Sequence, residues 1–213
     1  MYNTILFDLD GTLTDSGRGI TNSVAYALTE SGLEFKNREE LQCFIGPPLI
    51  KMFMQFCCVN EDKARDLVKK YREYYAVYGI FENDPYENIT ELLSRLHASG
   101  KKLILATSKP EHFAIKILEH FEMAKYFSLI CGATMDEKRT EKDAVIEYAL
   151  QSAGISDVSD VVMIGDREYD VIGAKKFGID SIGVLYGYGS RQELEKAGAT
   201  HIAETVNDIL KFV

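Results

Sequence analysis

Short apolar runs recur along the chain, and most are separated by stretches in which apolar residues lie three and four positions apart. A short apolar run bounded by turns is typical of a buried strand, whereas the three-and-four spacing is typical of an amphipathic helix. The pattern therefore predicts strands that alternate with helices. The predicted strands cover residues 4–7, 102–106, 127–131, 161–164 and 181–185.

A parallel sheet with helices on both faces is the expected arrangement, because helical segments join these strands. One predicted helix begins after Asn88, which suits an N-cap, and stops at Gly100, which suits a left-handed C-cap. The predicted fold class is α/β, with a Rossmann-like parallel sheet as its core. Ligands of such sheets bind beyond the carboxyl ends of the strands, so residues that follow a strand are the candidates for chemistry.

The alternation stops between about Asp15 and Phe81, where the pattern is helical and contains no convincing strand. We interpret residues 15–81 as a small α-helical domain inserted into an α/β core formed by residues 1–14 and 82–213. The helices expected in the insertion cover residues 19–31, 38–44, 48–57 and 61–78.

Charge and composition narrow the range of partners. The formal net charge of -9 disfavours non-specific binding of a nucleic acid polymer, because such binding needs many Lys and Arg side chains. A small anionic ligand is compatible with it, because a few local cations suffice. No apolar run is long enough to span a membrane, and the start of the chain lacks the features of a signal peptide. A cytoplasmic protein without a membrane partner is expected.

The cysteines show neither C-x-x-C spacing nor the density of a disulfide scaffold. We expect Cys43, Cys57, Cys58 and Cys131 to be buried thiols rather than zinc ligands or disulfide partners.

Two acidic pairs follow predicted strands. Asp8 and Asp10 come at the end of the first strand, and Asp166 and Asp170 come after the strand at 161–164. Clustered carboxylates need a cation or a proton to compensate their charge, so they indicate a divalent metal or shared acid–base work. If the two strands are neighbours, the four side chains form an oxygen-rich site that suits magnesium. An Asp-x-Asp pair also occurs in turns, and Asp170 could instead be an acid at a helix N-terminus.

A third strand end, at residues 107–110, offers hydroxyls, a cation and a helix-starting proline. Thr107, Ser108 and Lys109 would suit a phosphate group there. The alternative is that the hydroxyls are ordinary N-caps. Lys142 opens a predicted amphipathic helix, where the alternative is a solvated surface lysine.

In their order along the chain and in their sequences, these segments resemble the motifs of the haloacid-dehalogenase-like superfamily. Its members carry Asp-x-Asp-Gly, then Ser or Thr, then Lys, then Gly-Asp-x-x-x-Asp. Residues 8–12 resemble the first motif, Thr107 the second, Lys142 the third and residues 165–170 the fourth. The match spans nearly the whole chain, and the helical insertion resembles the family's cap of the first type. Dehalogenases of this superfamily lack the second aspartate of the first motif, so Asp10 favours phosphate-ester transfer.

The resemblance implies a magnesium-dependent phosphatase. Asp8 would be the nucleophile that forms an aspartyl phosphate, Asp10 the general acid and base, and Thr107 and Lys142 would stabilise the transition state. Magnesium would be held by Asp8, the main-chain carbonyl of Asp10 and Asp166, with Asp170 acting directly, through water or by holding Lys142. The expected substrate-binding residues are Gly11, Thr12, Ser108, Lys109, Gly46 and Arg18.

Residues 45–49, 165–167 and 186–189 resemble the phosphoglycolate-phosphatase-like branch, which also contains nucleotidase-like members. A small phosphorylated metabolite, such as phosphoglycolate or a nucleotide, is therefore the expected substrate of a monomer or homodimer. The alternative for residues 45–49 is a turn that merely joins two helices. Two other functions are left open: a phosphomutase resembling beta-phosphoglucomutase, and a catalytically silent binding protein on the same scaffold.

Overall fold

The computed structural model describes residues 2–136 and 138–213, and the chain divides into two compact units. The first comprises Met1–Thr14 and Pro85–Val213, and the second comprises Asp15–Asp84. The chain passes between them through β2 (Thr14–Asp15) and β3 (Asp84–Pro85), which pair as a two-stranded sheet. The second boundary thus follows Asp84 rather than Phe81.

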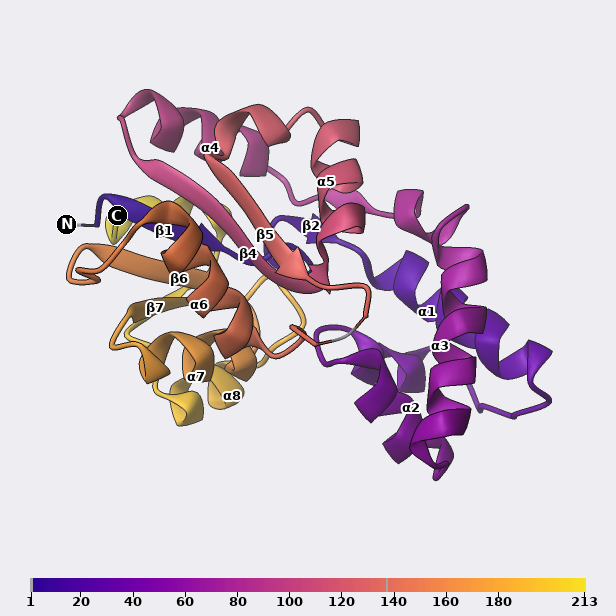
Figure 1. The fold of residues 1–213 in the computed structure, drawn as a ribbon. Coiled ribbons are helices and arrows are strands. Elements are labelled where there is room, and N and C mark those ends of the chain that lie inside the picture. Colours follow the sequence, from indigo (N-terminus) through magenta and orange to yellow (C-terminus); the bar gives the residue numbers. More distant parts are fainter. Residues whose placement is uncertain (1, 137) are drawn as a thin grey trace. The chain divides into compact units, whose positions relative to one another are not determined.

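The first unit is built on a six-stranded sheet of order β5-β4-β1-β6-β7-β8, in which the neighbouring strands pair in parallel (Figure 1). This confirms the predicted α/β fold class. Strand β1 lies between β4 and β6, so the strand ends that carry the candidate residues are adjacent. The strands are β1 (Thr4–Phe7), β4 (Lys102–Pro110), β5 (Leu129–Ala133), β6 (Val161–Gly165), β7 (Asp180–Val184) and β8 (His201–Ala203).

Helices cover both faces of this sheet (Figure 1). One face carries α4 (Ile89–Ala98) and α5 (Glu111–His120), and the other carries α6 (Lys142–Ala153), α7 (Glu168–Lys176) and α8 (Arg191–Ala197). The short 3-10 helices of this unit are η3 (Ala124–Tyr126) and η4 (Val206–Lys211). Apolar residues of α6 recur every three to four positions and pack on β1, β4 and β6, which fixes the start of α6 against the sheet. This core cluster contains Leu6, Ile104, Val145, Ile146, Ala149 and Met163.

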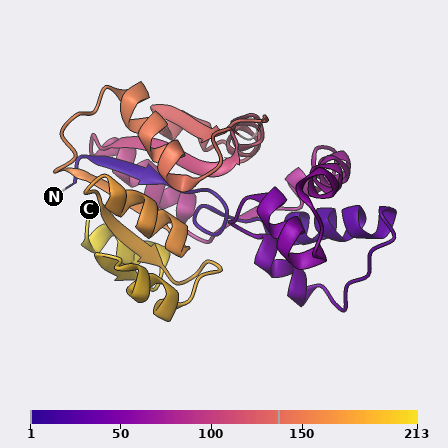
Figure 2. The same cartoon turned by 60° about the horizontal axis from the view of Figure 1, so that its bottom comes forward.

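The second unit is helical apart from its ends in β2 and β3, as far as the described residues extend. Figure 2 shows its helices, coloured indigo to purple, packed around one another. Aromatic contacts join them, with ring centroids 5.5 Å apart for Tyr26 and Tyr74 and 4.8 Å apart for Phe44 and Phe53. Its elements are α1 (Gly17–Glu30), η1 (Glu39–Phe44), α2 (Leu49–Cys57), α3 (Glu61–Tyr75) and η2 (Gly79–Phe81).

Several element bounds differ from those predicted. Strand β5 begins at Leu129 rather than at residue 127, because the Phe127 N–H donates to the Ala124 carbonyl at 3.2 Å and so ends η3. The Phe127 ring packs edge-on against Phe7 with centroids 6.2 Å apart. Strand β4 continues to Pro110 through a shift of register with β5. Asn88 is the N-cap residue of α4, as predicted, although it has a left-handed φ of 68° and its side chain makes no capping hydrogen bond. Gly100 has the expected positive φ of 79°.

The cysteine prediction was wrong in part. Cys131 is buried, but Cys43 and Cys58 are exposed and Cys57 is half-buried, and none of these four described residues forms a disulfide. Within the described residues, no helix has the length and apolar content needed to cross a bilayer.

Candidate active site

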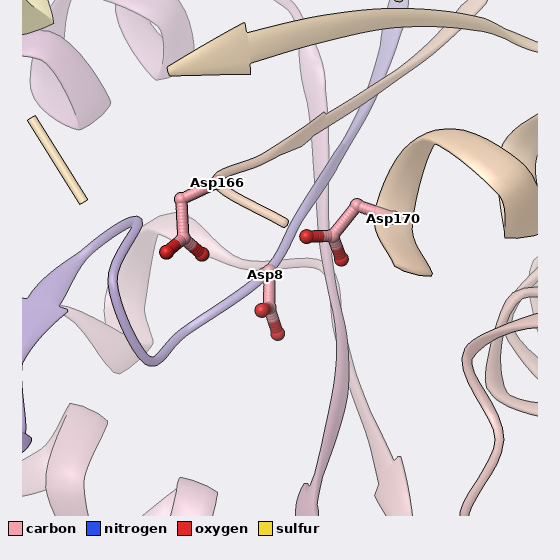
Figure 3. Close-up of side chains that lie close together, drawn as sticks. All are labelled: Asp8, Asp166 and Asp170. Atoms are coloured by element: carbon pink, nitrogen blue, oxygen red, sulfur yellow. The ribbon is translucent and has the colours of Figure 1, made fainter. Parts of the chain in front are cut away.

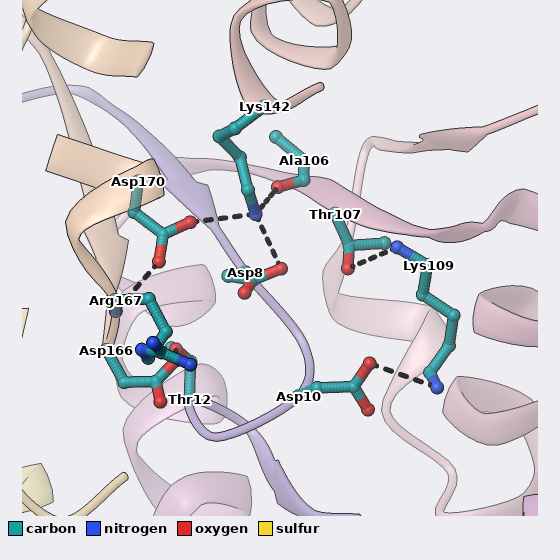
Figure 4. Close-up of polar contacts among 10 residues, drawn as sticks. All are labelled: Asp8, Asp10, Thr12, Ala106, Thr107, Lys109, Lys142, Asp166, Arg167 and Asp170. Atoms are coloured by element: carbon teal, nitrogen blue, oxygen red, sulfur yellow. Dashed lines mark hydrogen bonds and ion pairs between the residues drawn. The ribbon is translucent and has the colours of Figure 1, made fainter. Parts of the chain in front are cut away.

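Three neighbouring strands bring the candidate residues to one edge of the sheet. Asp8 follows β1, Thr107 lies in β4 and Asp166 follows β6 (Figure 4). Phe7 pairs with Leu105 on one side, and the Asp8 N–H donates to the Ile164 carbonyl at 2.9 Å on the other. The adjacency of the carboxyl ends therefore produces the site.

Three buried carboxylates form the centre of this site. Asp8, Asp166 and Asp170 are 7%, 0% and 2% exposed, and each contributes an oxygen that lies within 4.8 Å of the other two. Figure 3 shows the three side chains gathered from the end of β1, the loop after β6 and the first turn of α7. Buried like charges at this spacing require a compensating cation or proton.

Lys142, the first residue of α6, supplies part of that compensation. Its Nζ lies 2.7 Å from Asp8 Oδ1 and 2.8 Å from Asp170 Oδ1, and it donates to the Ala106 carbonyl at 3.1 Å (Figure 4). Burial acts to lower the pKa of Lys142, but Asp170 and Asp8 outweigh it and raise that pKa above its ordinary value. Lys142 is thus a charged, buried residue, and the alternative of a solvated surface lysine was wrong.

Asp170 lies at the start of a helix and also contacts Lys142. It lies in the first turn of α7, where its Oδ2 accepts a hydrogen bond from the Arg167 N–H at 3.1 Å. Its Oδ1 faces Lys142. The residue therefore fixes the start of α7 and the position of the lysine together.

Thr107 and Lys109 form a local turn at the end of β4. Thr107 is 1% exposed, and its Oγ1 accepts a hydrogen bond from the Lys109 N–H at 3.2 Å. Helix α5 begins later, at Glu111 after Pro110, so Thr107 is not its N-cap. The register of β4 with β5 shifts between Thr107 and Pro110, and irregularities of this kind re-aim side chains.

Lys109 pairs with Asp10, a contact that the sequence did not suggest. The Lys109 Nζ lies 3.0 Å from Asp10 Oδ2, and the two side chains are 5% and 12% exposed. Asp10 Oδ1 is buried and has no hydrogen-bond partner within the described residues. Lys109, which was expected to bind a substrate anion, thus forms an ion pair with Asp10.

The other predicted binding residues divide between the two units. Gly11 adopts a φ of 80°, Thr12 is fully buried with its hydroxyl 3.4 Å from Asp166 Oδ1, and Ser108 is half-buried. Arg18 and Gly46 belong to the second unit, where Arg18 is exposed and Gly46 has a φ of 102°.

The charge balance of the cluster fits a divalent cation. Three ionised carboxylates and one ammonium leave a formal charge of about -2, which one Mg²⁺ would neutralise. Burial first, then the charges of Asp170 and Asp8, raise the pKa of Asp166 well above its ordinary value, so this carboxylate lacks sufficient compensation. Oxygen ligands are those that Mg²⁺ prefers. The residues present therefore fit a magnesium ion.

Without divalent cations, the stability of the protein is expected to fall as the pH rises from about 4 through about 6. Burial raises the pKa of Asp170 to about 6, and Asp166 is also raised, whereas in the unfolded chain both titrate near 3.8. In this window the folded protein holds protons that the unfolded chain has released, so their stabilising contribution is lost as the pH rises through the folded pKa. Melting temperatures measured in EDTA should show this slope, and Asp170→Asn should flatten it. An equal slope in both proteins would contradict the prediction.

Two contacts to Asp166 and its loop were missed from the sequence. The Tyr188 N–H donates to Asp166 Oδ2 at 2.8 Å, and Glu193 pairs with Arg167 at 2.7 Å. The available signal was the Tyr-Gly-Tyr-Gly sequence at 186–189, which directly follows a strand.

A family model and several known proteins match most of this chain. The family model described as haloacid dehalogenase-like hydrolase matches residues 5–184, a range that contains Asp8, Lys142 and Asp170. The chain belongs to this family. As predicted, this haloacid dehalogenase-like hydrolase is a phosphatase, because relatives and solved structures described as phosphatases match nearly its whole length.

Three matches illustrate the range of related proteins. A 5'-nucleotidase of Pseudomonas aeruginosa is 44% identical over 200 residues, covering 94% of this chain and 90% of the relative. A tyrosine-protein kinase of Mycobacterium tuberculosis is 35% identical over 208 residues, covering 96% of this chain and 70% of the kinase. The crystal structure of a predicted phosphatase from Clostridium acetobutylicum has a TM-score of 0.96 and 47% identity, covering 99% and 97% of the two chains.

Proposed function

We propose that this phosphatase is a magnesium-dependent hydrolase of phosphate monoesters that forms an aspartyl phosphate on Asp8. The observation that carries the proposal is the buried cluster in which Lys142 contacts Asp8 and Asp170 and leaves a formal charge of about -2. Asp8, Asp166 and the main-chain carbonyl of Asp10 would hold the ion, with Asp170 nearby. Bound magnesium would supply positive charge beside the phosphoryl oxygens.

In the first half of the reaction, an Asp8 carboxylate oxygen attacks phosphorus while the bond from phosphorus to the ester oxygen breaks. Asp10 gives its proton to the departing oxygen, so the leaving group departs as a neutral alcohol. Lys142 holds Asp8 in place through Oδ1 and lends charge to the phosphoryl oxygens. The buried Thr107 hydroxyl would donate a hydrogen bond to one of those oxygens.

In the second half, Asp10 takes a proton from a water molecule that attacks the phosphorus of the aspartyl phosphate. The bond between Asp8 and phosphorus breaks, which releases inorganic phosphate and restores both carboxyl groups. One residue thus serves both half-reactions, in the opposite sense each time.

A small phosphorylated metabolite is the proposed substrate, with nucleoside monophosphates and phosphoglycolate as the first candidates. The nucleotidase relative supports the former, and the resemblance of residues 45–49 and 186–189 to phosphoglycolate phosphatases supports the latter. We also propose that the second unit acts as a cap that selects the substrate, through residues that include Arg18 and Gly46. A cytoplasmic location and a monomeric or homodimeric state stay predictions.

Phosphate release from a panel of esters tests this function. The panel should contain nucleoside monophosphates, phosphoglycolate, sugar phosphates, pyrophosphate and an aryl phosphate, each with magnesium and with EDTA. Release that requires magnesium supports the proposal, and the preferred ester identifies what the protein recognises. Failure on every ester, with the protein folded and binding magnesium, would contradict it.

The kinase relative favours a second candidate function, in which phosphate passes to an acceptor hydroxyl rather than to water. A mutase differs from a hydrolase in the same way. Adding a tyrosine peptide with ATP, or a sugar phosphate alone, to the same assay distinguishes them. A phosphorylated acceptor formed in place of free phosphate would assign the protein to phosphoryl transfer.

Replacing Asp10 with Asn should cost most with esters of poor leaving groups. The variant cannot protonate the departing oxygen, so kcat for an alkyl phosphate is expected to fall about 10³-fold, because general acid catalysis contributes on this scale. An aryl phosphate with an acidic phenol needs less protonation in the first step and should lose less in that step. Single-turnover kinetics with both esters measure the difference, and equal losses would contradict the acid role.

Lys109→Met tests whether the lysine acts through Asp10. Because its Nζ lies 3.0 Å from Asp10 Oδ2, its removal should reproduce the leaving-group dependence of Asp10→Asn in weaker form. Lys109→Arg, which keeps the charge, should retain most of the activity. A variant whose KM rises for phosphoglycolate alone, at constant kcat, would instead support the original interpretation of Lys109 as a binder of a substrate anion.

A further inference from the structure

The chain segment after β7 lies against both loops that carry the acidic residues. This segment, residues 186–193, comprises the turn 186–189, Ser190 and the first three residues of α8. Strand β7 is the neighbour of β6, so the segment begins at the edge of the sheet where Asp166 lies. The hydrolysis mechanism assigns no role to it.

The turn encloses Asp166 with main-chain atoms. The Tyr188 N–H donates to Asp166 Oδ2 at 2.8 Å. A Cβ added to Gly187 would lie 2.4 Å from the Asp166 Cβ, and one added to Gly189 would lie 1.8 Å from the Asp166 carbonyl oxygen. Only glycines allow so close an approach. As a result, the Asp166 side chain is fully buried, and its Oδ2 is bound by the main chain of the turn.

Glu193 holds the loop in which Asp166 lies. Its Oε1 accepts hydrogen bonds from Arg167 Nε at 2.7 Å and from the Glu168 N–H at 3.0 Å. The Glu193 N–H in turn donates to Ser190 Oγ, which caps α8 and fixes the position of the glutamate. The two residues that follow Asp166 are thereby tied to α8.

Tyr186 connects the same segment to the loop after β1. Its hydroxyl donates to the Thr12 carbonyl at 3.0 Å, and its ring packs edge-on against Tyr86 with centroids 5.0 Å apart. Thr12 also has its hydroxyl 3.4 Å from Asp166 Oδ1 (Figure 4). One segment therefore contacts the loop that begins with Asp8 and the loop that begins with Asp166.

We propose that the 186–193 segment is a positioning element that holds Asp166 at a fixed distance from Asp8 for magnesium binding, with Glu193 as its main anchor. The inference rests on the proposed magnesium site. Residues that orient metal ligands through hydrogen bonds typically contribute about 10- to 100-fold to affinity. Tyr188 and Glu193 act on Asp166 in this way, one through the carboxylate and the other through the backbone.

Magnesium affinity without substrate tests the proposal. Glu193→Ala is expected to weaken Mg²⁺ binding about tenfold in calorimetric titration, because the Asp166 loop loses its anchor. Glu193→Gln keeps an acceptor oxygen and should lose less. The matched control is Glu195→Ala, since Glu195 lies on the same helix, is 58% exposed and pairs only at 3.5 Å with Arg191; its affinity should stay within about twofold of wild type.

Tyr186→Phe provides a second, milder variant, because it removes one hydroxyl and keeps the ring. It is expected to weaken binding a few-fold at an unchanged fold, as judged by circular dichroism. Equal Mg²⁺ affinity in the wild type, Glu193→Ala and Tyr186→Phe, even with lowered melting temperatures, would show a purely structural role and overturn the inference. Absence of Mg²⁺ binding in the folded wild type would overturn both the inference and the proposed magnesium dependence.

Discussion

Replacing Asp8 with Asn is expected to lower phosphate release by about 10⁴-fold or more, because the amide cannot attack phosphorus and loss of a nucleophile has effects of this size or larger. The fold should survive the change. Asp8 is one of three clustered buried carboxylates, and Lys142 pairs with two of them, Asp8 and Asp170, so removing the charge of Asp8 relieves repulsion within the cluster. Without divalent cations, the variant is therefore expected to melt no lower than the wild type.

The assay should follow both phosphate release and labelled phosphoenzyme after an acid quench. The wild type should show label that is lost at alkaline pH, as expected of an acyl phosphate, and Asp8→Asn should show none. Asp157→Asn is a suitable control, because Asp157 is exposed in the loop that precedes β6. Asp8 lies at the other edge of the sheet, where β1 and β6 end. Phosphoenzyme formation by Asp8→Asn at the wild-type level would refute the assignment of the nucleophile.

Lys142→Met should lower both stability and activity. Removing the partner of buried charges costs about 3–5 kcal/mol, which for a chain of this size corresponds to a fall in melting temperature of roughly 10 °C. The lysine is 6% exposed and contacts Asp8, Asp170 and the Ala106 carbonyl, so no side chain of this size can replace it without loss. Activity should fall about 10²- to 10³-fold, because transition-state charge loses a fixed cation.

Calorimetry with EDTA and with magnesium measures how much of the lost stability depends on the absence of the metal. Magnesium should restore part of the lost stability, because it neutralises the same carboxylates, and the deficit should shrink at about pH 5 where some of them are protonated. Lys116→Met, on the exposed face of α5, should change the melting temperature little. A deficit that is equal with and without magnesium would contradict the view that lysine and metal compensate the same charge.

The sequence predicted the sheet well where apolar runs and strands coincide. Strand β1 matches its run from Thr4 to Phe7, because every side chain there is buried. Strand β5 was misplaced because Phe127 is apolar for its contact with Phe7 rather than for a strand. Strand β8 was missed because its three residues, His201 to Ala203, form a short edge strand without an apolar run.

The candidate site was predictable where it depends on side-chain type at strand ends. Asp8, Asp166 and Asp170 converge because their loops follow the neighbouring strands β1 and β6. The contact of Lys109 with Asp10 was not predictable, since it arises from a shift of register between β4 and β5. Main-chain donors such as the Tyr188 N–H leave no trace in residue type, and only the adjacent glycines hint at them.

The position of β1 in the middle of the sheet also determines when the site can form during synthesis. Thr4 pairs with Lys102 on one side and with Val161 on the other, so β1 is made before both of its partners and cannot complete its pairing until β6 has been made. The second unit consists of one continuous stretch and can complete its contacts earlier. Long-range parallel pairing of this kind folds slowly and leaves apolar strands exposed in the meantime. Asp8 is therefore made before both strands that flank its own, and it reaches its final surroundings only after β6 has been made.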